Sequence, residues 1–146
     1  MKQIITTLLA AALLFTGRAA ATDLVPVSVM QEFFITFTNA QDVKWEKRNG
    51  FDIASFVHKG IKKSAVYDQS GKLVTTARQI LPSELSAGLQ QDLKKRFADF
   101  YVATLFEMQD EEGTNYFITI TNGSEERILK GYRNRWVLMQ KKNIIK

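Results

Sequence analysis

The chain has 146 residues, of which 45% are hydrophobic, 11% aromatic and 24% charged, and its formal net charge is +5. This length suits one domain, or two very small ones, and excludes a large multidomain enzyme, and the composition excludes wholesale disorder. Because there is no cysteine and a single histidine, disulfides, thiolate metal sites and most histidine-based catalysis are also excluded.

Residues 1–21 have the pattern of a secretory signal peptide. Lys2 supplies the positive start, an apolar segment follows from Ile4 to Phe15, and small residues stand before position 22. A transmembrane anchor is the alternative, but about a dozen apolar residues cannot span about 30 Å of hydrocarbon. We expect cleavage near Ala21, export to the periplasm or beyond, and a mature chain of residues 22–146 without a membrane span.

Cleavage would also remove Lys2 and Arg18, which lowers the formal net charge from +5 to +3. A small basic surplus on an exported protein argues against nucleic acid as the partner.

The mature chain is predicted to begin with a helix and a set of short strands. Val27, Met30, Phe34 and Phe37 recur at helical spacing after Pro26, with Phe33 beside them, which predicts a helix with one wide apolar face. The helix aromatic residues Phe33, Phe34, Phe37 and Phe97 are expected to fill the core where each helix packs on its sheet. Turns containing glycine then separate four predicted strands, and connections this short require neighbouring strands to be antiparallel. The strands are expected at residues 43–47, 51–58, 61–67 and 72–80.

A second helix is predicted to start at Pro82-Ser83-Glu84. Leucines from Leu85 to Leu93 and then Phe97 step by four along one face, and a basic run near residue 95 suits the end of a helix. Four more antiparallel strands are expected at 100–109, 114–121, 124–130 and 135–142, with turns at Asn122-Gly123 and from Gly131 to Asn134. The predicted fold class is therefore α+β: a single domain made of two halves, about 26–80 and 82–142, each a helix packed on an antiparallel meander sheet.

Aromatic strands and a Tyr-Asp-x-x-Gly turn mark the first half of the chain. The motifs are Asp42-Val43-Lys44-Trp45-Glu46, Gly50-Phe51, Ala54-Ser55-Phe56, Ala65-Val66-Tyr67-Asp68 and Ser70-Gly71. This set resembles the PepSY-like, β-lactamase-inhibitor-like family of small exported bacterial proteins. The resemblance implies tandem helix-plus-sheet repeats similar to secreted β-lactamase inhibitor protein, in which an aromatic-rich concave sheet face grips the enzyme. That inhibitor carries disulfides, whereas this chain has no cysteine and no inhibitory loop that can be placed residue by residue.

The sequence offers few candidates for catalysis or metal binding. It has no glycine-rich phosphate loop, no Gly-x-Ser-x-Gly motif and no metal-spaced His/Cys set, so we expect no enzyme activity, no metal and no cofactor. His58 is expected to be structural or exposed. Asp110, Glu111 and Glu112 are expected to form a solvated hairpin tip, with a calcium site or a carboxylate-based hydrolase as the alternatives.

Both faces of the predicted strands carry apolar residues, as in Phe51 and Ile53 opposite Ala54 and Phe56. A sheet covered by helix on one side only should show one polar face. Two interpretations stay open: the face without a helix contacts a partner, or it is buried between the halves or against a second chain. The candidate contact residues are strand residues of interface-prone types: Trp45, Phe51, Ile53, Tyr67, Tyr116, Ile118, Tyr132 and Trp136.

A basic fringe is expected around these residues, formed by Lys62, Lys63, Arg133, Arg135, Lys141 and Lys142. Such cations either keep a strand edge from aggregating or dock an acidic protein, peptide or polymer. The sequence thus predicts a non-catalytic exported module that binds a protein or peptide, with an inhibitor-like role implied by the resemblance. The alternative is a structural envelope protein that self-associates into a homo-oligomer.

Overall fold

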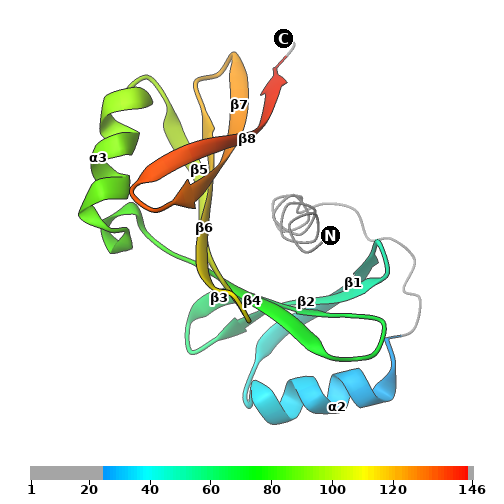
Figure 1. The fold of residues 1–146 in the computed structure, drawn as a ribbon. Helices are drawn as coiled ribbons and strands as arrows, with labels where there is room; N and C mark the ends of the chain where they lie inside the picture. The colour runs from blue at the N-terminus through cyan, green and yellow to red at the C-terminus, as the bar shows by residue number, and fades with distance from the viewer. Residues whose placement is uncertain (1–24, 145–146) are drawn as a thin grey trace. The chain divides into compact units, whose positions relative to one another are not determined.

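A computed structural model describes residues 25–144 of the chain (Figure 1). The predicted signal peptide and its cleavage site lie outside the described residues. Within them the chain forms two α-helices, one short 3-10 helix and eight strands. In chain order these are α2 (Val27–Thr36), β1 (Gln41–Arg48), β2 (Phe51–His58), β3 (Ile61–Tyr67), β4 (Leu73–Gln79), η1 (Pro82–Glu84), α3 (Ala87–Arg96), β5 (Tyr101–Asp110), β6 (Gly113–Thr121), β7 (Glu125–Tyr132) and β8 (Arg135–Asn143).

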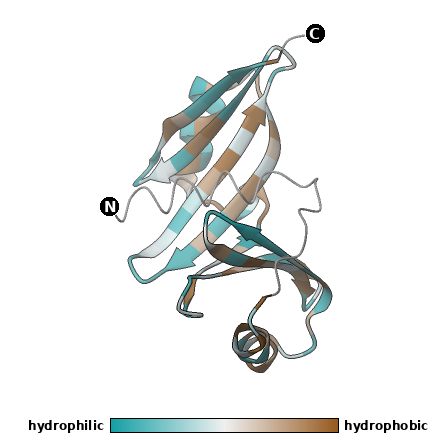
Figure 2. Cartoon of the chain, turned by 90° about the vertical axis from the view of Figure 1, so that its right-hand side faces the viewer, coloured by the Kyte–Doolittle hydropathy of each residue, from teal (hydrophilic) through white to brown (hydrophobic). Residues whose placement is uncertain are grey.

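The strands form an antiparallel meander in which hydrogen-bonded neighbours follow one another in chain order from β1 to β8. The α+β class is therefore confirmed, and β2 and β3 have the predicted bounds. Figure 2 shows hydrophobic and hydrophilic residues alternating along the strands, as expected when successive side chains point to opposite faces.

The described chain forms two compact units. The N-terminal unit comprises residues 25–78 and Gln109–Gly113, and the C-terminal unit comprises Gln79–Met108 and 114–144. The turn at 109–113 thus groups with the first predicted half. Its contacts explain this, because Thr75 Oγ1 donates to the carbonyl oxygen of Gln109 at 2.9 Å and Lys72 forms an ion pair with Glu111.

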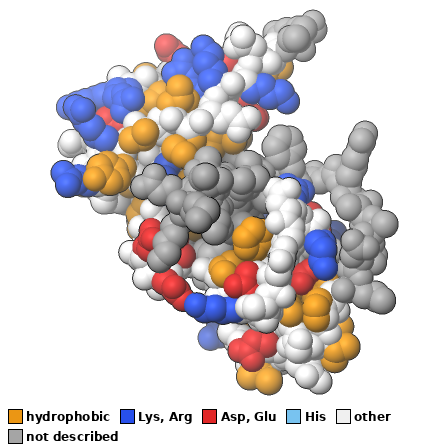
Figure 3. Space-filling view, turned by 45° about the vertical axis from the view of Figure 1, so that its right-hand side comes forward, with side chains coloured by type: hydrophobic (Ala, Val, Ile, Leu, Met, Phe, Trp, Pro, Cys, Tyr) orange, Lys and Arg blue, Asp and Glu red, His pale blue; other side chains and the backbone are white. Residues whose placement is uncertain are grey.

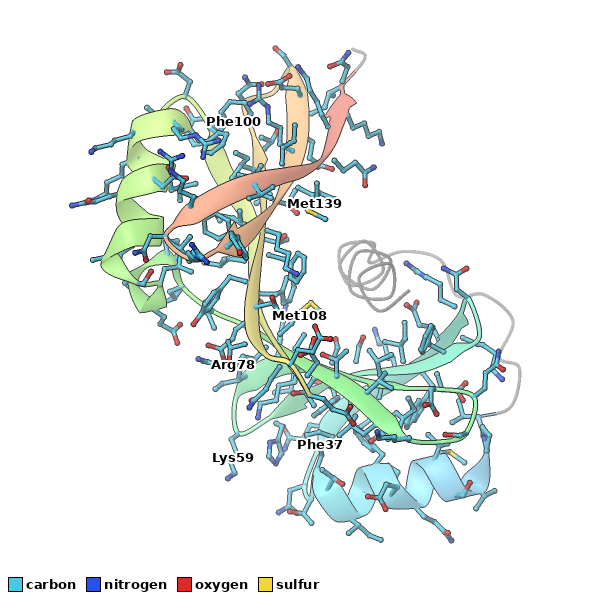
Figure 4. All side chains as sticks on the ribbon, viewed as in Figure 1. Phe37, Lys59, Arg78, Phe100, Met108 and Met139 are labelled. Carbon is cyan, nitrogen blue, oxygen red and sulfur yellow. The ribbon has the colours of Figure 1, made fainter. Side chains whose placement is uncertain are left out.

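An aromatic cluster holds α2 against the strands of the N-terminal unit. The Phe33 ring is fully buried, and its centroid lies 5.2 Å from that of Trp45 and 4.8 Å from that of Phe56. Phe37, labelled in Figure 4, follows α2 and lies 4.8 Å from the Phe56 ring. Such tilted and edge-to-face pairs add about 0.5–1.5 kcal/mol each beyond the burial of their area.

The buried face of α2 is narrower than the predicted one. Phe33 and Phe37 are buried as expected, together with Val29, whereas Val27 and Phe34 are exposed. The strands cover only part of the wide apolar face of this short helix. Phe33 faces the strands because its ring packs against the rings of Trp45 and Phe56.

In the C-terminal unit, α3 begins later than predicted. Pro82-Ser83-Glu84 forms the separate turn η1, and Leu85 then adopts an extended backbone and is buried. The helix starts after Ser86, whose Oγ accepts a hydrogen bond from the Leu89 N–H at 3.4 Å. The helix cannot continue from η1 because Leu85 is extended and buried in the core. The α-helix then begins after the next residue, Ser86, which is its N-cap.

Candidate protein-contact surface

The β7–β8 hairpin is closed by a two-residue turn. Tyr132 pairs with Arg135, and the turn between them contains Arg133 at a φ of 54° and Asn134. The prediction of a longer turn starting at Gly131 is therefore wrong, because Gly131 lies inside β7 and pairs with Trp136.

Close packing explains the glycine at position 131. A Cβ atom there would lie 3.3 Å from Leu89 Cδ1 and 3.3 Å from Tyr116 Cβ. At the start of α3, a Cβ atom on Gly88 would lie 2.5 Å from Asn134 Cγ. Both glycines let the helix and the hairpin approach each other, so α3 supports the end of the hairpin near its turn.

Trp136 fixes β8 to α3 through three hydrogen bonds. Its indole Nε1 donates to the carbonyl oxygen of Leu89 at 3.0 Å, and its backbone N–H donates to Asp92 Oδ2 at 2.8 Å. Its carbonyl oxygen accepts from Arg96 Nη1 at 2.9 Å, and Arg96 is itself paired with Asp92. Side chains of the helix thus satisfy backbone groups that an edge strand would otherwise present unpaired.

The opposite face of the hairpin is exposed, apolar and cationic. Strand alternation places Tyr132 and Val137 on the face away from Trp136, where they are 60% and 46% exposed. The Arg133 guanidinium lies 5.4 Å from the centroid of the Tyr132 ring. In the view of Figure 3, hydrophobic side chains of the C-terminal unit lie among Lys and Arg side chains. We refer to Lys130, Tyr132, Arg133, Arg135 and Val137 as the hairpin surface.

Cations outnumber acids on this hairpin, and some of them are already paired. Glu125 forms ion pairs with Arg127 and Lys141, and these two cations hold the pKa of its carboxyl below the usual range. In the described part of the chain, Arg135 and Lys142 have no carboxylate within ion-pair distance. They are therefore available to an acidic partner.

The structure buries four of the eight sequence-predicted contact residues. Tyr67 and Trp45 lie under α2, and Ile118, Tyr116 and Trp136 pack in the cluster under α3. Fully or almost fully buried are Ile53, Tyr67, Ile118 and Trp136; partly buried are Trp45, Phe51 and Tyr116; only Tyr132 is largely exposed. Tyr67, Ile118 and Trp136 are not available as a contact surface, because they pack in the clusters that hold α2 and α3 against the strands. Ile53 is only 2% exposed.

Tyr67 shows the consequence of this burial for its chemistry. Its ring is fully buried, and its hydroxyl has no hydrogen-bond partner among residues 25–144. Burial, with a smaller contribution from the negative charge of Glu32, raises the pKa of Tyr67 to about 12. The neutral phenol is therefore the form that the folded state accommodates.

Replacing Tyr67 with phenylalanine is expected to leave stability at neutral pH unchanged or slightly higher, because an unsatisfied buried hydroxyl is removed. The raised pKa contributes stability that is fully present below pH 10 and is lost as the pH rises towards 12. Over that window the wild type should lose about 2 kcal/mol more than Tyr67→Phe. Urea denaturation at several alkaline pH values measures the difference, and parallel curves for the two proteins would contradict the assignment.

The acidic turn and the histidine lie in the N-terminal unit. Asp110 Oδ1 accepts from the backbone N–H groups of Glu112 and Gly113 at 2.8 and 3.1 Å, and Glu111 is paired with Lys72. His58 Nδ1 lies 3.4 Å from Lys63 Nζ. Within residues 25–144, no three carboxylate or histidine side chains gather closely enough to hold a metal ion. Neither described α-helix is long and apolar enough to cross a membrane.

Comparison with solved structures shows a shared fold. A BLIP-like protein (one resembling β-lactamase inhibitor protein) from Bacteroides fragilis is 15% identical, with 85% of this chain and 89% of that one covered and a TM-score of 0.66. A candidate periplasmic protein from Bacteroides eggerthii is 17% identical, with 83% and 90% covered and a TM-score of 0.71. A DUF2874 family protein from Bacteroides ovatus is 19% identical, with 84% and 89% covered and a TM-score of 0.69.

The predicted likeness to the β-lactamase-inhibitor type is thereby confirmed at the level of the fold. No family model and no curated protein matches the sequence. At these identities the solved structures carry over the fold alone, and the PepSY-like assignment stays a prediction.

Sequence reasoning missed two residues of the exposed surface, Val137 and Leu138, which are 46% and 51% exposed. Neighbouring residues of a strand point to opposite faces of the sheet, so two apolar neighbours place an apolar side chain on each face. A helix on one face leaves the side chain on the other face uncovered. The cations on both sides of the run, at 135 and 141–142, were the available signal that this strand lies at an edge.

Proposed function

We propose that the protein is a non-catalytic, exported binding module that recognises a protein or peptide through the hairpin surface. The observation that carries the proposal is the exposed Tyr132 ring with the Arg133 guanidinium beside it. Tyrosine and arginine are the residue types that dominate binding energy at protein interfaces. Support from α3 keeps the hairpin ordered before binding, which lowers the entropy cost of association.

Export and family are part of the same proposal. Export is supported by the signal-peptide pattern of residues 1–21 and by the fold shared with a candidate periplasmic protein. A PepSY-like tandem repeat is supported by the presence, in each unit, of one α-helix packed on antiparallel strands. The expected partner is a protein or peptide rather than nucleic acid or membrane.

The non-catalytic assignment depends on the sequence, which lacks recognisable catalytic motifs. It is also supported by the acidic turn, whose Asp110 and Glu111 are engaged by backbone N–H groups and by Lys72. Carboxylates used in this way are poor candidates for paired acid–base catalysis.

Tyr132→Ala and Arg133→Ala are each expected to weaken partner binding by about tenfold or more, because anchor residues contribute about 2 kcal/mol. The measurement is calorimetry with a partner captured from envelope extract and then purified. Tyr101→Ala is the matched control, because Tyr101 is 76% exposed in the same unit but lies on β5. Equal affinities for Tyr132→Ala, Arg133→Ala and wild type would contradict the proposal.

Self-association is a second candidate, favoured by the outer side of α2. Val27, Phe34 and Ile35 are 64%, 51% and 73% exposed on that helix. Light scattering across a concentration series tests it with Ile35→Lys, which should abolish any dimer formed through α2. A monomer at all concentrations would exclude this candidate.

A further inference from the structure

We infer that the second half of β8 accepts an extended, acidic segment of the partner as an added strand. This inference depends on the proposed binding function and adds how the partner is held: backbone hydrogen bonds to an open sheet edge, with carboxylates placed beside Arg135 and Lys142. Strand addition of this kind takes affinity from the main chain and specificity from alternate side chains.

The edge of β8 is closed at one position and open beyond it. β8 is the last strand of the sheet, and the outward backbone groups of Trp136 are taken by Asp92 and Arg96. Outward-pointing residues alternate along an antiparallel edge strand, so Leu138 turns its N–H and carbonyl the same way. Among the residues that the structure describes, these groups of Leu138 have no hydrogen-bond partner.

A bulge sets where the edge opens again. The register shifts opposite Ile128 and Leu129, between Leu138 and Gln140. Further on, the N–H of Ile144 points inward and donates to the carbonyl oxygen of Ser124 at 2.8 Å. Counting back from Ile144 by alternation, Lys141 turns its backbone outward, so an added strand would meet Leu138 and Lys141 on either side of the bulge.

The other edge of the sheet is defended more fully. β1 begins with a register shift between Gln41 and Lys44, and Asp42 there has a φ of 53°. Charged side chains fill the rest of β1 up to Arg48, interrupted by Trp45. Bulges and charges are the usual devices against edge pairing, and β8 has both, but it is charged at three of nine residues where β1 is charged at five of eight. β8 alone offers an apolar run, Val137-Leu138-Met139. The Met139 side chain lies on the side of β8 away from α3 (Figure 4).

Charge selects an acidic partner over a second copy of the chain. β8 contains Arg135, Lys141 and Lys142 and no acidic residue. Pairing two copies along this edge would bring four unpaired cations together, Arg135 and Lys142 of each copy, and like charges opposite each other destabilise paired strands. The open stretch from Val137 to Lys142 corresponds to about 17 Å of extended chain, with Arg135 shortly before it and Lys142 at its end. The fitting segment is therefore about six residues long, with carboxylates at both ends and β-branched residues between them.

The test uses a short synthetic peptide with glutamate at both ends and alternating valine and threonine between them, titrated into the full mature chain. Backbone amide NMR reports binding, and the largest shifts are expected at Leu138 and Lys141. A peptide with lysine in place of glutamate should not bind. Leu138→Pro removes one outward N–H without touching the β7 ladder and should weaken binding about tenfold or more. Leu138→Ala keeps that N–H and should retain most of the affinity.

If Leu138→Pro does not fold, a peptide N-methylated on its pairing edge replaces it and should bind the wild type about tenfold more weakly or worse. Absence of shifts at Leu138 and Lys141 with millimolar peptide, equal binding of the lysine peptide, or undiminished binding by Leu138→Pro would each overturn the inference. The proposed function has a separate readout. A purified partner that is lost with Tyr132→Ala but bound fully by Leu138→Pro leaves that function standing and removes strand addition.

Discussion

Replacing Trp136 with alanine is expected to lower the free energy of unfolding by about 3–5 kcal/mol, the largest effect of any single change in the C-terminal unit. Its side chain is 1% exposed and packs among Leu89, Ile118 and Leu129. The substitution also removes the indole donor to the carbonyl oxygen of Leu89. Urea denaturation followed by far-UV circular dichroism measures the loss.

Two controls separate the parts of this effect. Trp136→Phe keeps most of the buried ring and removes the hydrogen bond, so it should cost less than the alanine variant. Tyr132→Ala removes an exposed ring from the same hairpin and should change stability by no more than about 0.5 kcal/mol. A Trp136→Ala protein as stable as Tyr132→Ala would show that α3 does not hold β8 as described.

Replacing Phe33 with alanine is expected to cost about 3–5 kcal/mol in the N-terminal unit. Phe33 is fully buried and contacts the rings of Phe37, Trp45 and Phe56, with centroids no more than 5.3 Å away. Removing it leaves a cavity at the centre of this cluster and frees α2 from the strands. The measurement is again urea denaturation, combined with amide hydrogen exchange over residues 27–36.

The neighbouring residue offers a matched control for Phe33. Phe34 is 51% exposed, so Phe34→Ala removes the same chemical group from the same helix with far less loss of packing. It should cost well under half as much as Phe33→Ala. The reverse order would mean that Phe34, and not Phe33, faces the core of this unit.

The limits of the strands could be predicted because the residues within each turn determine them. Gly50, Gly60 and Gly123 adopt positive φ values of 82°, 76° and 85° in the turns where the sequence placed them. Turns of two residues, as at Gly50 and Gly60, or of three, as at Gly123, force adjacent strands to be antiparallel, so order and pairing follow. Gly131 did not fit this reasoning because its small size serves contact with Leu89, which is far away in the sequence.

The contact surface was harder to predict because it depends on which face each helix covers. Trp45, Tyr67, Tyr116 and Trp136 are residue types favoured both in cores and at interfaces. Alternation separates the two faces of a strand, but it does not tell which one lies under a helix. Tyr132 is exposed because its register opposite Arg135 turns it away from Trp136 and hence from α3.

These features give a consistent physical account of a binding module. The buried aromatic residues hold each helix to its strands, and Trp136 with Gly131 holds the β7–β8 hairpin against α3. What remains exposed on this rigid support is an aromatic ring, apolar strand residues and unpaired cations. Such a combination suits recognition of an acidic protein segment by a preformed surface.

Binding through the β7–β8 hairpin can be measured by amide hydrogen exchange of the mature chain, free and bound to its purified partner. We expect binding to slow exchange in β7 and β8, with the Leu138 amide among the most protected, while exchange in α2 stays unchanged. Protection confined to α2 or to β1, with β8 exchanging as in the free protein, would contradict it.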